Sequence, residues 1–217
     1  MGLFKNLSQA KVSRDYIFLN QCAGNYLTRI DAVKVGKQWP DGRDTRTRKR
    51  EEFIAIEETI IAILSSNEAP PLHAVGDEVS HFIMVTGSEY ADKEWASFLC
   101  GLFGLKGAED LDRPEIKALV GGIEFDDWAG NEDAAKGVVQ PLRGVVVEIN
   151  NRMRALKKVN PTDPDKFFCK VHTKREVPAV EVLQVLTAMD KTGGLVNRFF
   201  PNNFLQNKIA EEAAVAK

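Results

Sequence analysis

A dense run of basic residues stands between residues 43 and 50 of the chain. Five of these eight positions are basic, against the single acidic Asp44. Like charges this close repel one another unless solvent or a polyanion screens them, and backbone phosphates are an obvious polyanion. Trp39 precedes the run and offers an indole for stacking on a base. The segment therefore suggests a phosphate-binding loop with a stacking aromatic; the alternative is a solvated loop with Trp39 packed on the core.

A second basic cluster lies about 100 residues further along the chain. Basic residues stand on both sides of the turn-like segment 160–165, including Lys166, Lys174 and Arg175. Two basic clusters indicate nucleic-acid binding more specifically than either one alone, if the fold brings them to one face. The residues that we predict to bind nucleic acid are Lys37, Trp39, Arg43, Arg46, Arg48, Lys49, Arg50, Arg152, Arg154, Lys157, Lys158 and Lys170.

Nothing in the sequence provides a comparable basis for catalysis. The phosphate-loop, dinucleotide-binding, nucleophile-elbow and zinc-protease motifs are all missing from the sequence. We therefore expect a protein that is not an enzyme, with no catalytic residue and no cofactor.

Metal binding is not indicated either. Segment 108–133 carries nine acidic and two basic residues, but their spacing matches no calcium-loop pattern. His73 and His81 are eight residues apart, roughly 26 Å along an extended strand. Cys169 and His172 are three residues apart, so on a strand they belong to opposite faces. We expect no metal site, and we interpret the acidic segment as a solvated or partner-facing patch.

Composition and charge indicate a globular protein of the cytoplasm. The 217 residues are 44% hydrophobic and 28% charged, with a net charge of −2, so any affinity for nucleic acid must come from local clusters. Three well-separated cysteines suit reduced thiols. The most apolar stretch, 53–64, contains Glu57 and Glu58 and is too short to span a bilayer. No membrane association is expected.

The elements that must position the basic clusters follow from hydrophobic patterning. Strands are predicted at 25–37, 51–64 and 75–85, an amphipathic helix at 91–103, and a short helix around 114–120. Residues 143–158 and 166–176 should form a hairpin around a Pro- and Asp-rich turn, and a helix should follow Pro178. The predicted class is α+β, mainly β.

Three strands, a helix and a closing hairpin form the element order of a five-stranded oligonucleotide/oligosaccharide-binding (OB) barrel. We expect this barrel over residues 1–177, with an acidic excursion at 108–133, and a C-terminal helix and tail over 178–217. In this architecture the loop after strand one and the loop between strands four and five flank one binding face. Both basic clusters would then lie on one side of the barrel.

Several short segments carry a resemblance to a known family. They are the opening MGLFKNL, the first strand from GNY to VKVGK, the VGDEV turn at 75–79, and the helix ending in FLCGLFG at 98–104. Over about residues 1–177 the chain resembles bacteriophage and prophage proteins that are similar to single-stranded DNA-binding proteins. The resemblance implies an OB barrel that coats single-stranded DNA, beside a recombinase, nuclease or polymerase.

Two features depart from that family. The basic loop at 43–50 is long, and segment 209–217 lacks the acidic tail with which many such proteins recruit partners, so the acidic segment 108–133 is a candidate substitute. Our functional expectation is sequence-independent binding of single-stranded DNA in phage replication or recombination, in the host cytoplasm. The alternative is a structural or assembly protein of a virion, in which the same barrel mediates contacts between subunits and oligomerisation.

Overall fold

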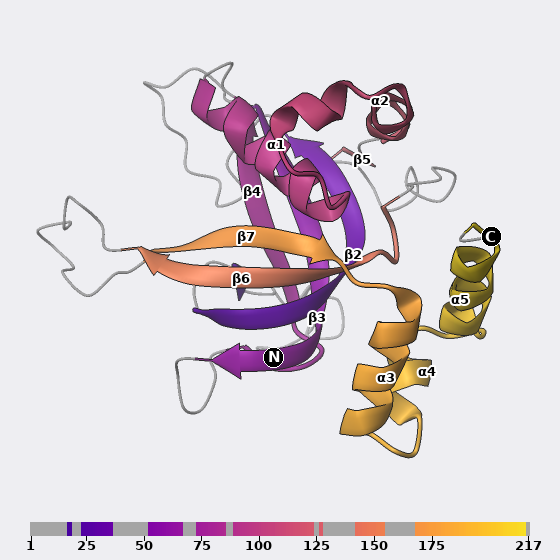
Figure 1. Ribbon diagram of the computed structural model, residues 1–217. Helices are drawn as coiled ribbons and strands as arrows, with labels where there is room; N and C mark the ends of the chain where they lie inside the picture. The colour runs from indigo at the N-terminus through magenta and orange to yellow at the C-terminus, as the bar shows by residue number, and fades with distance from the viewer. Residues whose placement is uncertain are drawn as a thin grey trace, which may run out of the picture.

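The computed structural model describes residues 17–18, 23–36, 52–66, 73–85, 89–123, 126–127, 142–154 and 168–215 of the chain. In these ranges it is an α+β protein built around an antiparallel sheet (Figure 1). The long strands are β2 (Gly24–Gly36), β3 (Glu52–Ser66), β4 (Glu78–Val85), β6 (Val146–Arg154) and β7 (Phe168–Glu176). The helices are α1 (Glu89–Leu102), the 3-10 helix η3 (Ala108–Asp112), α2 (Pro114–Gly121), α3 (Ala179–Met189), α4 (Gly194–Phe199) and α5 (Phe204–Val215).

The long strands are ordered β4-β3-β2-β6-β7, and each neighbouring pair is antiparallel. Strand β2 is central, because Asn25 lies opposite both Ser65 on β3 and Asn150 on β6. Two short strands join in parallel, β1 (Ile17–Phe18) beside β4 and β5 (Asp126–Asp127) beside β2. The five predicted strands, the helix between the third and the fourth, and the final hairpin are confirmed.

The sheet does not close into the expected barrel. Among the described residues β4 and β7, the two ends of the five-strand order, do not pair with each other. The second edge of β4 pairs with β1, where Ile17 lies opposite Val79. Helix α1 contacts both β4 and β7. The sheet is therefore open, with a helix packed against both strands that closure would join.

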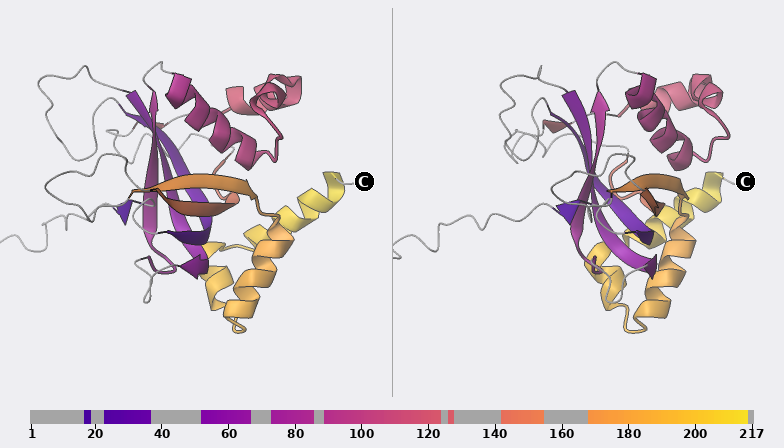
Figure 2. Two further views of the ribbon diagram at one scale, coloured as in Figure 1. Left: turned by 60° about the vertical axis from the view of Figure 1, so that its left-hand side comes forward. Right: turned by 90° about the vertical axis from the view of Figure 1, so that its left-hand side faces the viewer.

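Apolar residues at alternate positions along the strands pack into two cores, one on each face of the sheet. Tyr26 of β2 faces an inner core, which α1 completes with Phe98 and Leu102. The neighbouring Leu27 faces an outer core, completed by residues such as Leu186 of α3. We call these the inner and the outer face. Figures 1 and 2 show α1–α2 and α3–α5 packed against the sheet at separate places.

The C-terminal part is more structured than the predicted helix and tail. Two further helices, α4 and α5, follow α3, and Val196, Phe199 and Leu205 are buried in the outer core. Asp190 directly follows α3, and its carboxylate accepts hydrogen bonds from the backbone N–H groups of Thr192 and Leu195, at 2.9 and 3.0 Å. Together with the Thr192 hydroxyl, these bonds hold the pKa of Asp190 below its usual range. Gly193–Gly194 and Pro201 divide the apolar pattern into short pieces, which is why the sequence predicts only the first of these helices.

Candidate nucleic-acid interface

The predicted site residues divide into two groups. Nine lie outside the described residues: Lys37, Trp39, Arg43, Arg46, Arg48, Lys49, Arg50, Lys157 and Lys158. The other three lie on the β6–β7 hairpin, where Arg152 is the direct cross-strand partner of Lys170. Arg154 is two residues beyond Arg152 and lies opposite Phe168. Positions two apart on a strand belong to one face, so the hairpin brings three basic positions together on one surface.

That surface is the outer face of the sheet. Along β6 the same set of alternate positions includes Glu148 and Asn150, which lie opposite Leu27 and Asn25 of β2. Leu27 belongs to the outer core, which α3–α5 cover. The polar positions lie further along the hairpin, beyond Leu27. The basic positions of the hairpin therefore lie on the outer face, beyond the part that α3–α5 cover.

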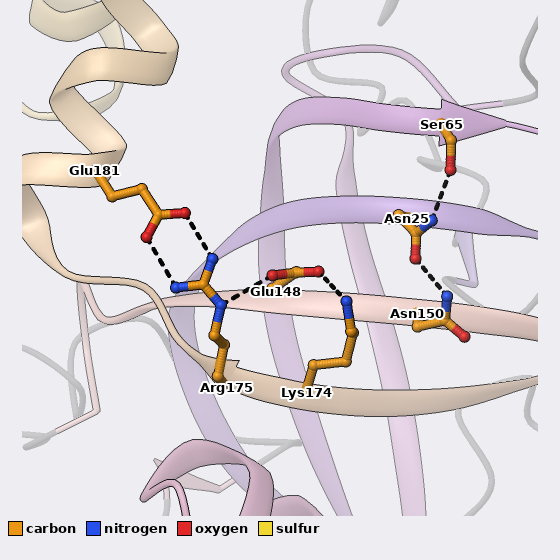
Figure 3. Close-up of polar contacts among 7 residues, drawn as sticks. All are labelled: Asn25, Ser65, Glu148, Asn150, Lys174, Arg175 and Glu181. Atoms are coloured by element: carbon orange, nitrogen blue, oxygen red, sulfur yellow. Dashed lines mark hydrogen bonds and ion pairs between the residues drawn. The ribbon is translucent and has the colours of Figure 1, made fainter.

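Three uncharged side chains form a ladder across this part of the outer face (Figure 3). The Asn25 amide donates to the Ser65 hydroxyl at 2.7 Å, and the amide of Asn150 donates to the Asn25 carbonyl oxygen. Asn25 and Asn150 are half-buried and Ser65 is exposed. We call Ser65, Asn25 and Asn150 the polar ladder. Its amides and hydroxyl are groups able to donate to and accept from bases or sugars.

Gly24 allows β2 and β3 to approach at the start of this ladder. A Cβ atom at Gly24 would lie 2.5 Å from the backbone oxygen of Ser65. Real Cβ atoms do not approach an oxygen this closely, so a side chain would force the two strands apart. The glycine thus supports the short cross-strand distance on which the Asn25–Ser65 bond depends.

A cluster of charges adjoins the ladder on the same face (Figure 3). The β6–β7 register shifts between Glu148 and Ile149, so that Lys174 is an extra residue in β7. A bulge of this kind sets two residues of one strand against one residue of the other. As a result Lys174 and Arg175 both contact Glu148, Arg175 through its Nε at 3.0 Å. Arg175 also donates two hydrogen bonds to Glu181 of α3, at 2.8 and 2.6 Å.

The ion pairs change the titration of this charge cluster. The hydrogen bonds from Arg175 hold the pKa of Glu181 below its usual range. Partial burial acts to raise the pKa of Glu148, but the hydrogen bonds from Lys174 and Arg175 outweigh it and lower the pKa. The pKa of Arg175 is raised, chiefly by its bonds to Glu181. Glu148, Glu181 and Arg175 are therefore ionised at neutral pH.

The two predicted loops leave the sheet at opposite ends of β2. Gly36 at one end of β2 lies opposite Phe53 of β3. At the other end Gly24 lies opposite Asn151, and β6 continues past it to Arg154. A nucleic-acid strand that touched both loops would have to run along the sheet, over at most about 40 Å for the twelve steps of β2.

A buried Glu–His pair lies on the other face of the sheet. The Glu58 carboxylate accepts a hydrogen bond from the Thr28 hydroxyl at 2.8 Å and lies 3.0 Å from Nδ1 of His81. Glu58 is 1% exposed and His81 is 8% exposed, below the Phe98 ring of α1. The three polar residues join strands β2, β3 and β4 inside the core. Because these three side chains are buried, a ligand in solvent cannot reach them.

The sequence prediction missed the polar ladder and the bonds that Glu148 makes with Lys174 and Arg175. Each depends on the strand register, which a single sequence does not reveal. Among the described residues, no group of three or more His, Cys, Asp or Glu side chains is placed to hold a metal ion. No helix in the described ranges is both long and apolar enough to cross a membrane.

No protein-family model, no curated protein and no solved structure matches this chain.

Proposed function

We propose that this protein binds single-stranded DNA without sequence preference, through the outer face of the β6–β7 hairpin and the adjoining loops. The observation that carries the proposal is the register pairing of Arg152 with Lys170, with Arg154 next along β6, beside the polar ladder. Basic positions grouped on one face attract a phosphate backbone. Uncharged amides beside them suit contacts with sugars and bases.

The strand order supports an OB-type architecture for this binding surface. Of the five long strands, the first, β2, is central and pairs with the second, β3, and the fourth, β6. Helix α1 follows the third strand, β4, and β6 and β7 form the final hairpin, as in an OB fold. OB folds are described as partly open barrels, and the open β4–β7 edge fits that description. Such folds bind oligonucleotides on the sheet surface and on the two loops that correspond to residues 37–51 and 155–167.

Binding would combine two physical contributions. The basic residues Arg43, Arg46, Arg48, Lys49 and Arg50 of the first loop, with Arg152, Arg154, Lys157, Lys158 and Lys170 of the hairpin, would neutralise phosphates and release counterions. Trp39 would stack on a base, a contact that tolerates every base because each has a π-face. Among the described aromatic side chains, Trp95 stacks on Phe98 within the protein, with ring centroids 5.4 Å apart.

The resemblance to phage single-stranded DNA-binding proteins suggests the biological setting. It favours a role in phage DNA replication or recombination in the host cytoplasm, beside a recombinase, nuclease or polymerase. Exposed acidic residues of η3 and α2, such as Glu109 and Glu115, belong to the segment that we propose as the partner contact. No catalytic activity and no cofactor is part of the proposal.

A mobility-shift experiment with a labelled single-stranded oligonucleotide tests the proposal. The parent protein should retard the oligonucleotide at low salt, and the triple variant Arg152→Ala, Arg154→Ala and Lys170→Ala should retard it less. The matched control replaces Lys106, Lys117 and Lys191 by Ala, because these exposed lysines lie outside the sheet and the net charge changes equally. A parent protein that leaves the oligonucleotide unretarded but self-assembles would refute DNA binding and favour the virion alternative.

A further inference from the structure

The charge cluster of Lys174, Arg175, Glu148 and Glu181 lies on the path that a bound strand would take. Lys170 and Lys174 are four residues apart on β7, or roughly 13 Å along the strand, with His172 between them. Glu148 is two residues from Asn150 of the polar ladder on β6. The cluster therefore continues the outer-face surface toward α3, where Figure 3 shows it between the ladder and the helix.

The cluster has the geometry of an anion-binding site in which the protein's own carboxylates are the bound anions. Arg175 binds the Glu181 carboxylate through two donors, at 2.8 and 2.6 Å, and its Nε reaches Glu148 at 3.0 Å. The planar guanidinium recognises a carboxylate and a phosphate with the same two-pronged geometry. The bulge adds Lys174 as a second cation on the same side. A phosphodiester group could replace a carboxylate here without any change in the type of contact.

The two carboxylates differ in how easily they could be replaced. The Glu148 side chain is 11% exposed and is held by both cations. The Glu181 side chain is 40% exposed and reaches over from α3 to an arginine that is 41% exposed. Ion pairs this exposed contribute little to stability. Glu181 is therefore the ligand that a polyanion would displace, while Glu148 stays in place.

From these observations we propose that Lys174 and Arg175 form a further phosphodiester-binding site, which Glu181 of α3 occupies when no nucleic acid is bound. The inference rests on the proposed function and adds a regulatory contact to it. Helix α3 lowers the affinity for single strands because a phosphate has to compete with the Glu181 carboxylate. Removing that one charge makes the site available.

The test compares two variants that change the net charge by the same amount. Glu181→Gln should bind a labelled single-stranded oligonucleotide about two- to fivefold more tightly than the parent, which is the affinity equivalent of one exposed ion pair. Its slope of log affinity against log salt should steepen by about 0.7, for one added phosphate contact. The control is Glu211→Gln on α5, which removes an exposed carboxylate 4.0 Å from Lys208.

A second variant identifies the cation that is responsible. Adding Arg175→Ala to Glu181→Gln should return affinity and salt slope to about the parent values, and melting temperatures should show that every variant is folded. Equal affinities of Glu181→Gln and Glu211→Gln would overturn this inference alone, provided that the parent binds single strands and the hairpin triple variant binds them less. If the parent itself does not bind, the proposed function and this inference both fall.

Discussion

Gly101 of α1 lies directly against the backbone oxygen of Thr173 on β7. A Cβ atom at position 101 would be 2.1 Å from that oxygen and 2.8 Å from the carbonyl carbon. Only glycine permits this approach, so the packing of α1 on β7 depends on it. The same helix contacts β4, the strand at the other end of the five-strand order.

Replacing Gly101 by Ala should therefore destabilise the protein, although alanine normally stabilises a helix interior relative to glycine by roughly 0.5–1 kcal/mol. The added methyl group has to push the helix away from backbone atoms, and overpacking of this kind typically costs about 1–3 kcal/mol. Gly121→Ala in α2 is the matched control, because no atom beyond its chain neighbours and its own helix backbone lies within 4 Å of the added Cβ. Chemical denaturation should give a lower free energy of unfolding for Gly101→Ala only; an equal or higher value would contradict the packing.

Leu186 of α3 is fully buried in the outer core, whereas Met189 on the same helix is 46% exposed. Leu186→Ala should lower the free energy of unfolding by about 2–5 kcal/mol through lost burial and the cavity that remains. Met189→Ala should change it by less than about 0.5 kcal/mol. Similar small losses for both variants would mean that α3–α5 do not pack on the sheet as described.

Acid should weaken the contact between α3 and the hairpin. The pKa values of Glu148 and Glu181 are lowered in the folded state, so their contribution to stability is present above the pKa of an unfolded glutamate. It is lost as the pH falls through the lower folded-state values, below about pH 4.3. In thermal melts between about pH 5 and 3, the Tm of Glu181→Gln should fall less with decreasing pH than the Tm of the parent. Equally steep losses would contradict this linkage.

Trp39 gives a prediction that separates stacking from charge. Trp39→Ala should weaken the binding of single strands by about 1–3 kcal/mol if the indole stacks on a base. The salt dependence should stay as in the parent, because stacking releases no counterion. Fluorescence anisotropy titrations at several salt concentrations measure both quantities. Unchanged affinity would assign Trp39 to the protein core instead.

The sequence predicts the strands well where β-branched residues dominate. Ile54, Ile56, Ile60 and Ile61 favour a strand over 51–64, and the structure has β3 there. The hairpin was also predictable, since the turn-forming segment 160–165 separates two alternating patterns. Open sheet edges could not be predicted in the same way. They depend on the packing of α1 against Thr173 and on the pairing of β1 with β4.

Contacts within the candidate site were less predictable than the strands. The sequence places Lys174 and Arg175 in the second basic cluster, and the structure shows that both bind Glu148. The bulge that brings the two side chains to one carboxylate leaves no signal in a single sequence. The same holds for Glu58 and His81, which are 23 residues apart and meet only through the β3–β4 register. Strand alternation alone predicts that positions 152 and 154 share a face, whereas their pairing with position 170 depends on the β6–β7 register.

The salt dependence of binding tests the central claim most directly. If about four to six basic residues contact phosphates, the slope of log affinity against log salt for the parent should be about −3 to −4 on single strands. Replacing Arg46, Arg48 and Arg50 by Ala, or Arg152, Arg154 and Lys170 by Ala, should flatten the slope by about two in each case. The control triple variant at Lys106, Lys117 and Lys191 should keep the parent slope. A parent slope near zero, or equal flattening in the control, would contradict electrostatic binding of single-stranded DNA by this face.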